Sequence, residues 1–524
     1  MGLKIRSVAL AFLLLSLLLL HPSSASLPSA SPLMWSSCTA YGQIGTECAL
    51  LKVFLDQDNP DPTRMINSFV RRFYSGPAPT NNSIWCVAGG PGDSTTSFTG
   101  MAEVFVANDP TVTVYLVDQR GTGMSSLMTC ENQPGTFFDP SNNSLIAPWE
   151  ECYLDVLRKY GNDLPYYSTY HAALDFLSVV NAVNPDKIAI YALSCGTYFI
   201  NTYLLLPGAR ADVMVLDGPV PPTRWALENN AEWVSHVAQD VIEVCKDSSV
   251  SCLKHMGIVP HSPRLLMDDI IDGTLPCMAK LKWVSQLVVS SIMQQMLTSP
   301  NGRVAMGPFW WRLHRCSASD VEQLDFYYRT HWRWEVPPPN PADYSLGLAM
   351  AVATSELYSF APPGQELDYD FQVRYTGRLF ASAGVQLSVS YGISVDHWPR
   401  YTVNPTVFRK FAKPTMPVLI LVGTMDPNTE YGLGSVFQEG LSEGNPSANV
   451  VLGTVPYANH GTLEPDAYCV QSIILPFLKS FGAQPANLTC LSQLPCPDFE
   501  GAQAATQNYS TSIFGVPNLW NDDV

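Results

Sequence analysis

Short runs of apolar residues, bounded by polar or glycine-rich turns, recur along the first 220 residues and again near residue 418. Five of these runs have strand length and predict buried strands at residues 84–87, 112–117, 188–191, 213–216 and 418–422. Helical patterns precede and follow the third run, at residues 170–183 and 198–206. Strands that alternate with helices predict a mostly parallel sheet with helices on both faces.

The pattern changes between residues 221 and 404. Trp, Tyr and Pro become frequent, as in the Phe-Trp-Trp run at 309–311, and strand-like runs disappear. Strand character returns at residues 417–423. We therefore expect an α/β core formed by residues 26–220 and 405–524, interrupted by an inserted, mostly helical cap domain at residues 221–404.

The first 25 residues have the pattern of a secretory signal peptide. Two basic residues precede an apolar run at 8–20, and small residues follow at Ser23 and Ala25. The alternative, an uncleaved anchor, needs about 20 apolar residues to span a bilayer, and this run is shorter. We expect residues 1–25 to be removed and the protein to be secreted or delivered to a lysosome-like compartment, without a membrane partner.

Composition narrows the possible partners. A chain that is 46% hydrophobic and 14% charged is globular rather than disordered. The net charge of −17 argues against a nucleic-acid partner, because phosphate binding needs clustered Lys and Arg. The histidines show no metal-ligand spacing such as His-Glu-x-x-His, so we expect no metal and no other cofactor.

Cysteines and sequons agree with an oxidising compartment. Thirteen cysteines suit disulfide formation, and because the number is odd at least one thiol is free or pairs between chains. Four Asn-x-Ser/Thr sequons predict glycosylation at Asn81, Asn142, Asn487 and Asn508.

A candidate nucleophile stands at the end of the third predicted strand. The sequence Ala192-x-Ser194-x-Gly196 leads from that strand directly into a helix. This is close to the Gly-x-Ser-x-Gly nucleophile elbow, a sharp turn that exposes the serine hydroxyl above the sheet. Ala192 departs from the first glycine of that motif. An ordinary structural serine in a strand-to-helix turn is the alternative interpretation.

A glycine-rich segment at residues 89–92 follows the first predicted strand. Glycines there let the backbone approach a substrate carbonyl and offer an N–H to its developing negative charge. We predict that the oxyanion donors are the backbone N–H groups of Gly90 and Cys195. A phosphate-binding loop is excluded, because no Gly-Lys-Ser/Thr ending follows. A plain tight turn is the remaining alternative.

Two further residues complete a catalytic triad. Asp426 lies just beyond the predicted strand at 418–422, and His460 lies in a glycine-containing loop. The chain order Ser, Asp, His is the order of α/β-hydrolases. In such a triad His460 takes the proton of Ser194, and Asp426 orients the imidazole and stabilises its charged form. Asp217, after another strand, is the fallback acid.

Four motifs in this order resemble those of the proline iminopeptidase and tripeptidyl aminopeptidase family of α/β-hydrolase serine peptidases. They are residues 89–92, residues 118–123 (Asp-Gln-Arg-Gly-Thr-Gly), the Ser194 elbow and residues 216–218 (Leu-Asp-Gly). The resemblance covers nearly the whole mature chain. It implies an α/β-hydrolase fold, the triad Ser194, Asp426 and His460, and removal of residues from the N-terminus of peptides. Ala88 replaces a usual His and Ala192 a usual Gly, but no reacting group is lost.

The resemblance also implies a cysteine pairing. The expected disulfides are Cys38–Cys48, Cys130–Cys152, Cys245–Cys252, Cys277–Cys316 and Cys469–Cys490. We expect Cys86 and Cys195 to be buried thiols, with Cys195 a packed residue rather than a second nucleophile. Cys496 has no expected partner.

Other residues have supporting roles in this interpretation. We expect Asp118 and Arg120 to pair and brace the oxyanion side of the site, and residues 396–398 (Asp-His-Trp) to serve packing. In the cap, Glu228 and Glu232 are candidates for binding the ammonium group of a peptide's free N-terminus, or are solvated helix residues.

The favoured function is thus a secreted serine exopeptidase that acts through an acyl-enzyme on peptides with a free N-terminus. A secreted carboxylesterase or lipase with the same triad is the first alternative, because the triad does not distinguish amides from esters. A hydrolase-fold binding protein without catalysis is an alternative of another class. The oligomeric state is left open.

Overall fold

The structure, a computed structural model, describes most of the chain between residues 32 and 521. The described ranges are 32–38, 46–130, 136–139, 144–146, 149–223, 229–257, 263–332, 335–336, 340–357, 400–463 and 467–521, together with Ala381 and Trp398. The predicted signal peptide at residues 1–25 lies outside them.

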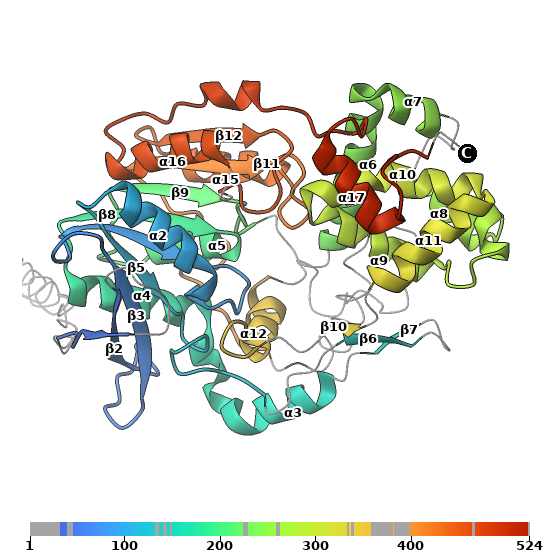
Figure 1. Cartoon of the computed structure of the whole chain (residues 1–524). Coiled ribbons are helices and arrows are strands. Elements are labelled where there is room, and N and C mark those ends of the chain that lie inside the picture. The colour runs from blue at the N-terminus through green and yellow to red at the C-terminus, as the bar shows by residue number, and fades with distance from the viewer. Residues whose placement is uncertain are drawn as a thin grey trace, which may run out of the picture.

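Nine strands form one sheet in the order β1-β2-β3-β5-β4-β8-β9-β11-β12 (Figure 1). Their bounds are β1 Ser36–Ser37, β2 Thr46–Phe54, β3 Met65–Phe73, β4 Asn82–Val87, β5 Thr113–Val117, β8 Lys187–Leu193, β9 Val213–Asp217, β11 Pro417–Gly423 and β12 Asn449–Val455. Every pairing from β5 to β12 is parallel, whereas β1, β2 and β3 are antiparallel. This arrangement confirms the predicted α/β-hydrolase fold.

The five strands predicted from apolar runs correspond to β4, β5, β8, β9 and β11. These strands are buried along most of their length, which gives them continuous apolar sequences. The hairpin of β2 and β3 was not predicted. Its strands carry Lys, Arg and Glu on partly exposed faces, so their apolar signal is weaker.

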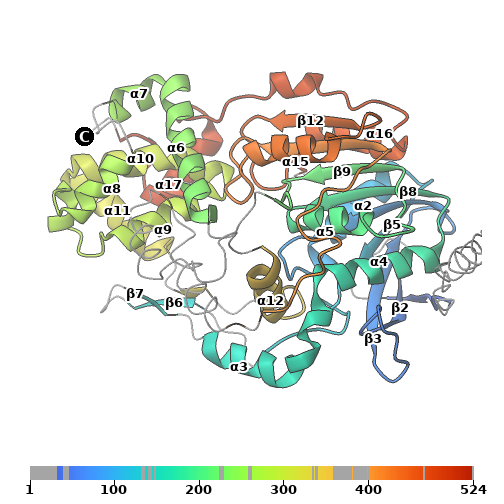
Figure 2. The ribbon, with the colours of Figure 1, turned by 180° about the vertical axis from the view of Figure 1, so that it is seen from behind.

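Helices cover both faces of the sheet (Figure 2). On one face lie α4 (Thr169–Val183), α5 (Cys195–Leu204) and α15 (Gly432–Ser442). On the other lie α2 (Thr99–Asn108) and α16 (Tyr468–Lys479). The two faces of β8 show the alternation, because Ile190 belongs to the first apolar cluster and Tyr191 to the second.

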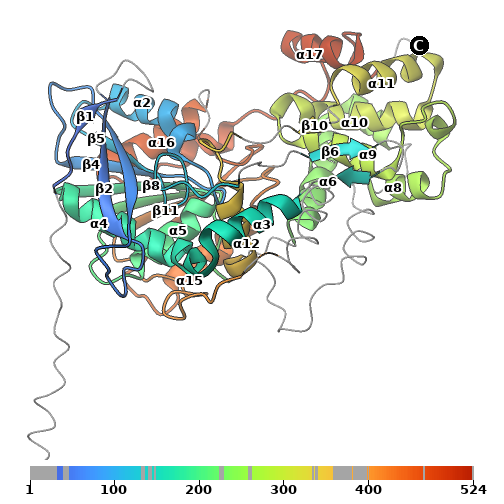
Figure 3. The ribbon, with the colours of Figure 1, turned by 90° about the horizontal axis from the view of Figure 1, so that it is seen from below.

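A helical lobe lies beside the carboxyl ends of β9, β11 and β12 (Figures 1 and 3). Its helices are α6 Asn230–Ser248, α7 Val250–Met256, α8 Pro263–Ile271, α9 Gln286–Leu297, α10 Pro300–Arg315 and α11 Ala318–Thr330. Phe309 and Trp310 are fully buried in its apolar core. The aromatic density at residues 309–311 therefore reflects packing inside the lobe.

Two helices and a small second sheet lie outside the main sheet and the lobe core. The helix α12 (Leu346–Glu356) packs against α3 (Trp149–Tyr160) rather than within the lobe. A small sheet joins three short strands that lie far apart in sequence, in the order β10, β6, β7. Their bounds are β6 Thr136–Asp139, β7 Ser144–Ile146 and β10 Glu335–Val336.

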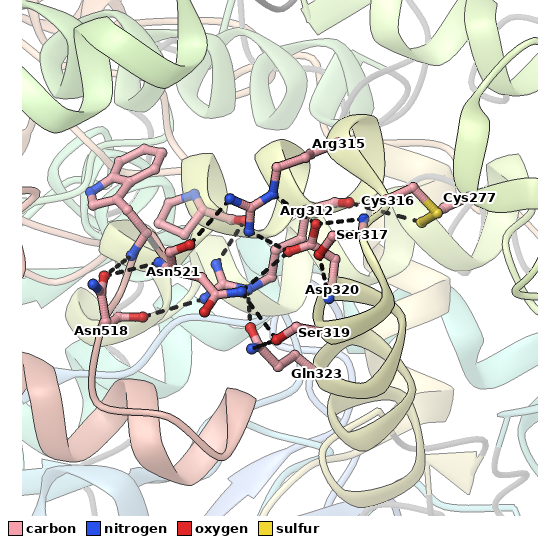
Figure 4. Close-up of polar contacts among 12 residues, drawn as sticks. Cys277, Arg312, Arg315, Cys316, Ser317, Ser319, Asp320, Gln323, Asn518 and Asn521 are labelled. Carbon is pink, nitrogen blue, oxygen red and sulfur yellow. Dashed lines mark hydrogen bonds and ion pairs between the residues drawn. A yellow bond between two sulfur atoms is a disulfide. The ribbon is translucent and has the colours of Figure 1, made fainter. Parts of the chain in front are cut away.

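The C-terminal segment returns to the lobe, although the sequence grouped it with the core. The helix α17 (Ala504–Phe514) packs on α10 and α11. The buried Arg312 of α10 donates to the carbonyl oxygens of Asn518 and Leu519, and it also donates to Gln323 Oε1 at 2.7 Å (Figure 4). The segment around residues 518–519 is thus part of the lobe's polar core.

All five expected disulfides are present: Cys38–Cys48, Cys130–Cys152, Cys245–Cys252, Cys277–Cys316 and Cys469–Cys490. Cys86 and Cys195 are buried thiols, as predicted, and Cys496 is an unpaired, partly exposed thiol. No helix within the described ranges has the length and apolarity needed to cross a membrane.

The predicted glycosylation sites differ in what the structure describes. Asn81, Asn487 and Asn508 are exposed, whereas Asn142 lies outside the described residues. Glycosylation at these sites stays a prediction.

Candidate active site

Ser194 occupies the turn between β8 and α5. Its backbone has φ 56° and ψ −131°, a strained combination for a residue with a side chain. Its N–H donates to the carbonyl oxygen of Asp217 at 2.9 Å, and Thr197 Oγ1 donates to the Ser194 carbonyl oxygen at 2.7 Å. These bonds hold a turn in which the serine is the residue at the strand's end, as in a nucleophile elbow.

Gly196 lets the helix approach the sheet at this turn. A Cβ atom at Gly196 would lie 2.6 Å from the carbonyl oxygen of Val87 in β4. Gly89 approaches from the other side, because its Cβ would lie 2.7 Å from Ser194 Cβ. Ala192, the departure from the usual glycine, is an ordinary buried sheet residue. The elbow therefore tolerates Ala192 but requires Gly196.

His460 and Asp426 are paired at the same edge of the sheet. His460 Nδ1 lies 2.8 Å from Asp426 Oδ2. The Asp426 carboxylate also accepts from the N–H groups of Asn428 and Thr429 and from Thr429 Oγ1, and only 1% of the residue is exposed. A carboxylate that only accepts makes Nδ1 the protonated nitrogen, which leaves Nε2 of His460 as the basic one.

Asp217 fixes the loop that carries His460. It is fully buried and accepts from the N–H and Oγ1 of Thr462, two residues beyond His460, and from Tyr191 OH at 2.7 Å. The next residue, Gly218, lies against the His460 ring, since a Cβ there would be 3.1 Å from Nδ1. Asp217, the fallback acid of the sequence analysis, thus has a positioning role, and Asp426 holds the imidazole.

The electrostatics of the site favour a charged His460. Burial lowers the pKa of His460, but the carboxylates of Asp426, Asp217 and Asp93 outweigh it, so the pKa is raised. A raised pKa stabilises the imidazolium that forms when His460 takes a proton.

Asp93 is a member of the site that sequence reasoning missed. It follows the glycine segment, and its carboxyl group is close enough to His460 and Cys195 to influence the pKa of each. Burial raises the pKa of Asp93 to about 6, and His460 opposes this shift. The sequence offered one signal for Asp93, its place directly after residues 89–92. A residue beside an oxyanion loop also borders the substrate.

The two residues predicted to supply the oxyanion donors are in contact. Cys195 is the first residue of α5, where N–H groups have no intrahelical acceptor. Its Sγ donates to the carbonyl oxygen of Gly90 at 3.2 Å, and Gly90 is exposed with φ 107°. Burial raises the pKa of Cys195 to about 12, so it remains a thiol and does not act as a second nucleophile.

The expected ion pair between Asp118 and Arg120 is wrong. Arg120 instead binds the carboxylate of Asp175 through Nε and Nη2, at 2.7 and 2.6 Å. Asp118 accepts from the N–H groups of Thr95 and Met124. The side chains of residues two apart point to different partners in this turn. Asp118 still braces the segment that follows the glycines, through Thr95.

The helical lobe contacts the loop before His460. Asn459 Nδ2 donates to the carbonyl oxygen of Thr298 at 2.6 Å, and Arg303 Nη1 donates to that of Tyr457 at 3.2 Å. Thr298 and Arg303 belong to the α9–α10 region of the lobe. The lobe therefore borders the candidate active site.

The structure places the cap candidates as follows. Glu232, in the first turn of α6, is partly exposed and lies 3.9 Å from His236, whereas Glu228 lies outside the described residues. Trp398 is buried against Tyr153, which agrees with its predicted packing role, and the two residues before it lie outside the described ranges.

Comparison with known proteins agrees with this fold. Residues 388–490, which include Asp426 and His460, match the family model of TAP-like proteins. The chain is accordingly a hydrolase of the α/β-hydrolase superfamily, as the resemblance in its motifs implied. No curated protein matches it.

Solved structures with similarity to the chain include several hydrolases. Proline iminopeptidase from Mycobacterium smegmatis is 14% identical, with 83% of this chain and 98% of that one covered and a TM-score of 0.36. An esterase from Exiguobacterium antarcticum is 10% identical, with 79% and 96% covered and a TM-score of 0.33. Epoxide hydrolase VrEH1 from Vigna radiata is 12% identical, with 79% and 95% covered and a TM-score of 0.32.

Proposed function

We propose that the protein is a serine hydrolase in which Ser194, His460 and Asp426 act as the triad. Ser194 Oγ attacks the substrate carbonyl carbon while His460 Nε2 takes its proton, and the N–H groups of Gly90 and Cys195 stabilise the oxyanion. His460 then protonates the leaving group, and water releases the acyl group by the same steps. The hydrogen bond between His460 and Asp426, at the edge where the Ser194 turn ends, is the observation that carries this proposal.

We propose further that the substrate is a peptide with a free N-terminus, from which the enzyme releases one or a few residues. The TAP-like match supports peptide hydrolysis. The position of Asp93 supports recognition of an ammonium group, because a partly exposed carboxylate that influences both His460 and Cys195 can attract a cation beside the reacting carbonyl. Burial of Asp93 strengthens the preference for free over blocked N-termini, since a buried carboxylate without a cationic partner costs several kcal/mol.

The helical lobe acts as a cap in this proposal, and Glu232 at the start of α6 is a second carboxylate available to the amine. We propose secretion as the setting, on the basis of the pattern in residues 1–25 and the five disulfides.

Matched peptides with free and acetylated N-termini test the substrate class. Acetylation should lower kcat/KM by about a hundredfold or more, which is roughly 2.7 kcal/mol of transition-state binding. Asp93→Asn should remove most of this preference while leaving the hydrolysis of short esters within a few-fold of wild type.

Each contrary outcome identifies another function. Equal kcat/KM for the two peptides, with efficient ester turnover, would replace the exopeptidase proposal by an esterase. Absence of turnover, together with absence of labelling by a fluorophosphonate, would identify a binding protein on a hydrolase fold.

A further inference from the structure

Three metal-ligand side chains meet outside the Ser194 site. Asp56 and Asp58 lie in the loop after β2, and His171 lies in the first turn of α4, which packs beside β2 (Figure 3). One ligand atom from each residue lies within 4.8 Å of the other two. His171 Nε2 is 3.9 Å from Asp56 Oδ1. Two acidic residues and an imidazole are thus brought together by tertiary packing.

The imidazole of His171 has one satisfied and one unsatisfied nitrogen. Its Nδ1 lies 2.9 Å from Ser168 Oγ, which also caps the helix. Its Nε2 is buried and has no hydrogen-bond partner among the residues that the structure describes, and only 8% of His171 is exposed. Buried polar atoms in native proteins are almost always bonded, so this nitrogen needs a partner.

The orientation of the ring identifies the kind of partner. In metal-binding histidines, a hydrogen bond at the ring nitrogen that does not bind the metal fixes the orientation of the ring. The contact between His171 Nδ1 and Ser168 Oγ is of this kind. It leaves Nε2 facing the carboxylates of Asp56 and Asp58. When Nδ1 carries the proton and donates to Ser168 Oγ, the Nε2 lone pair faces two anions, an arrangement that a bound cation stabilises. We propose that Asp56, Asp58 and His171 bind a divalent transition-metal ion, with Zn²⁺ the ion best suited to one imidazole and two carboxylates.

The geometry requires only a small closure. Zinc bonds of about 2.0–2.2 Å place tetrahedral ligands roughly 3.4 Å apart. The ligand atoms, which lie within 4.8 Å of one another, must therefore approach by up to about 1.4 Å, which rotation of the exposed Asp58 and partly exposed Asp56 provides. Both carboxylates are already oriented by hydrogen bonds, from Tyr170 OH to Asp58 at 2.9 Å and from Asn59 to Asp56 at 3.1 Å. Water completes the coordination.

The position of the site gives the ion a stabilising role rather than a catalytic one. Gln57, between the two ligands, donates to Asp175, the partner of Arg120. Arg120 in turn donates to the carbonyl oxygen of Leu55 at 2.7 Å. An ion at Asp56, Asp58 and His171 would therefore tie the end of β2 to α4 and to the Arg120 loop. The spacing rules of the sequence analysis miss such a site, because its two segments are more than a hundred residues apart.

Titration of the mature chain with Zn²⁺, followed by calorimetry and thermal unfolding, tests the proposal. We expect one site with a Kd of about 10 µM or below, and a rise in Tm of at least about 2 °C at saturating Zn²⁺. Asp58→Asn and His171→Gln should each weaken binding at least tenfold. Asp61→Asn is the matched control and should bind like wild type, because Asp61 is a partly exposed acid of the same loop whose carboxylate accepts from Thr63.

Two results would overturn the proposal. One is that Asp58→Asn binds Zn²⁺ with the same affinity and stoichiometry as Asp61→Asn. If His171→Gln fails to fold, Asp58→Asn decides the question, because Asp58 is exposed. The other is a rise in Tm with Ca²⁺ and none with Zn²⁺, which would reject a transition metal. Peptidase or esterase activity does not enter either readout, so the result is independent of the proposed function.

Discussion

Ser194 combines a strained backbone with a network of bonds that maintains it. A non-glycine residue at φ 56° costs of order 1–3 kcal/mol, and such strain persists only where the surroundings over-determine it. The bonds from Ser194 N–H to Asp217 and from Thr197 to the Ser194 carbonyl provide that support. They belong to the backbone and to neighbours, so the serine hydroxyl itself is not needed for the turn.

Ser194→Ala should consequently lower kcat by about a thousandfold or more, while the fold is retained. Turnover of the best peptide or ester, together with the circular dichroism spectrum and Tm of the variant, checks this. A variant that keeps a tenth of wild-type activity with an unchanged pH profile would reject Ser194 as the nucleophile.

The charge of Asp93 should be visible in the pH profile. His460 works as a base only when neutral, so kcat/KM should fall as pH drops through its pKa, which lies above the ordinary 6.5. Asp93→Asn removes one of the anions that stabilise the imidazolium, and the acid limb of the profile should move to lower pH.

An exposed acid at the opposite end of β8 provides the control for this shift. Asp186→Asn should leave the profile in place. An acid limb that stays at the wild-type pH in Asp93→Asn would show that Asp93 and His460 are not coupled.

At the scale of elements, the site depends on the closeness of α5 to the sheet. Gly196 is the contact point, because a methyl group there would meet the carbonyl oxygens of Val87 and Ala88 at 2.6 and 2.8 Å. Backbone atoms of a central strand cannot move aside as a flexible side chain can. A methyl group at position 196 would therefore displace the elbow that carries Ser194.

Gly196→Ala should lower the free energy of unfolding by about 1–3 kcal/mol and reduce turnover. Urea unfolding midpoints and kcat/KM measure the two effects. Gly100→Ala in α2, where nothing lies within 4 Å of the added methyl, should be neutral or slightly stabilising. Similar destabilisation of both variants would contradict the close contact at Gly196.

At the scale of the whole molecule, the C-terminal segment joins the helical lobe to the core. After α16 the chain crosses to the lobe, where the carbonyl oxygen of Leu519 accepts from Arg312. Burial lowers the pKa of Arg312 to about 9, and its guanidinium also lies 4.0 Å from the centre of the Phe514 ring. The lobe's stability therefore depends on residues that follow the core in sequence.

Arg312→Gln should lower stability by at least about 2 kcal/mol, because it leaves buried carbonyl oxygens of the C-terminal segment without a donor. Thermal unfolding and limited proteolysis should show earlier loss of that segment. Arg329→Gln, whose side chain is 67% exposed, should change stability by less than about 0.5 kcal/mol. Equal protease resistance of Arg312→Gln and wild type would reject this anchoring role.

The sequence by itself determined the parallel centre of the fold and the strand ends at which the candidate residues lie. Strands such as β8 and β11 are buried on both faces, so their apolar runs are unambiguous without knowledge of their neighbours. The turn around Ser194 is recognisable because its motif depends on neighbouring residues in the sequence alone. Ser194 and Asp426 follow β8 and β11, whose carboxyl ends share one edge of the sheet.

Only the tertiary structure decided which distant residues become neighbours. It paired Arg120 with Asp175 instead of Asp118. It placed Asp93 close enough to His460 to raise the pKa of the imidazole. It also brought Asp56, Asp58 and His171 together. It also assigned α17 to the lobe. These relations depend on how helices and loops from separate segments pack over the sheet. No local period or spacing encodes that packing, because several side chains of similar chemistry compete for each buried partner.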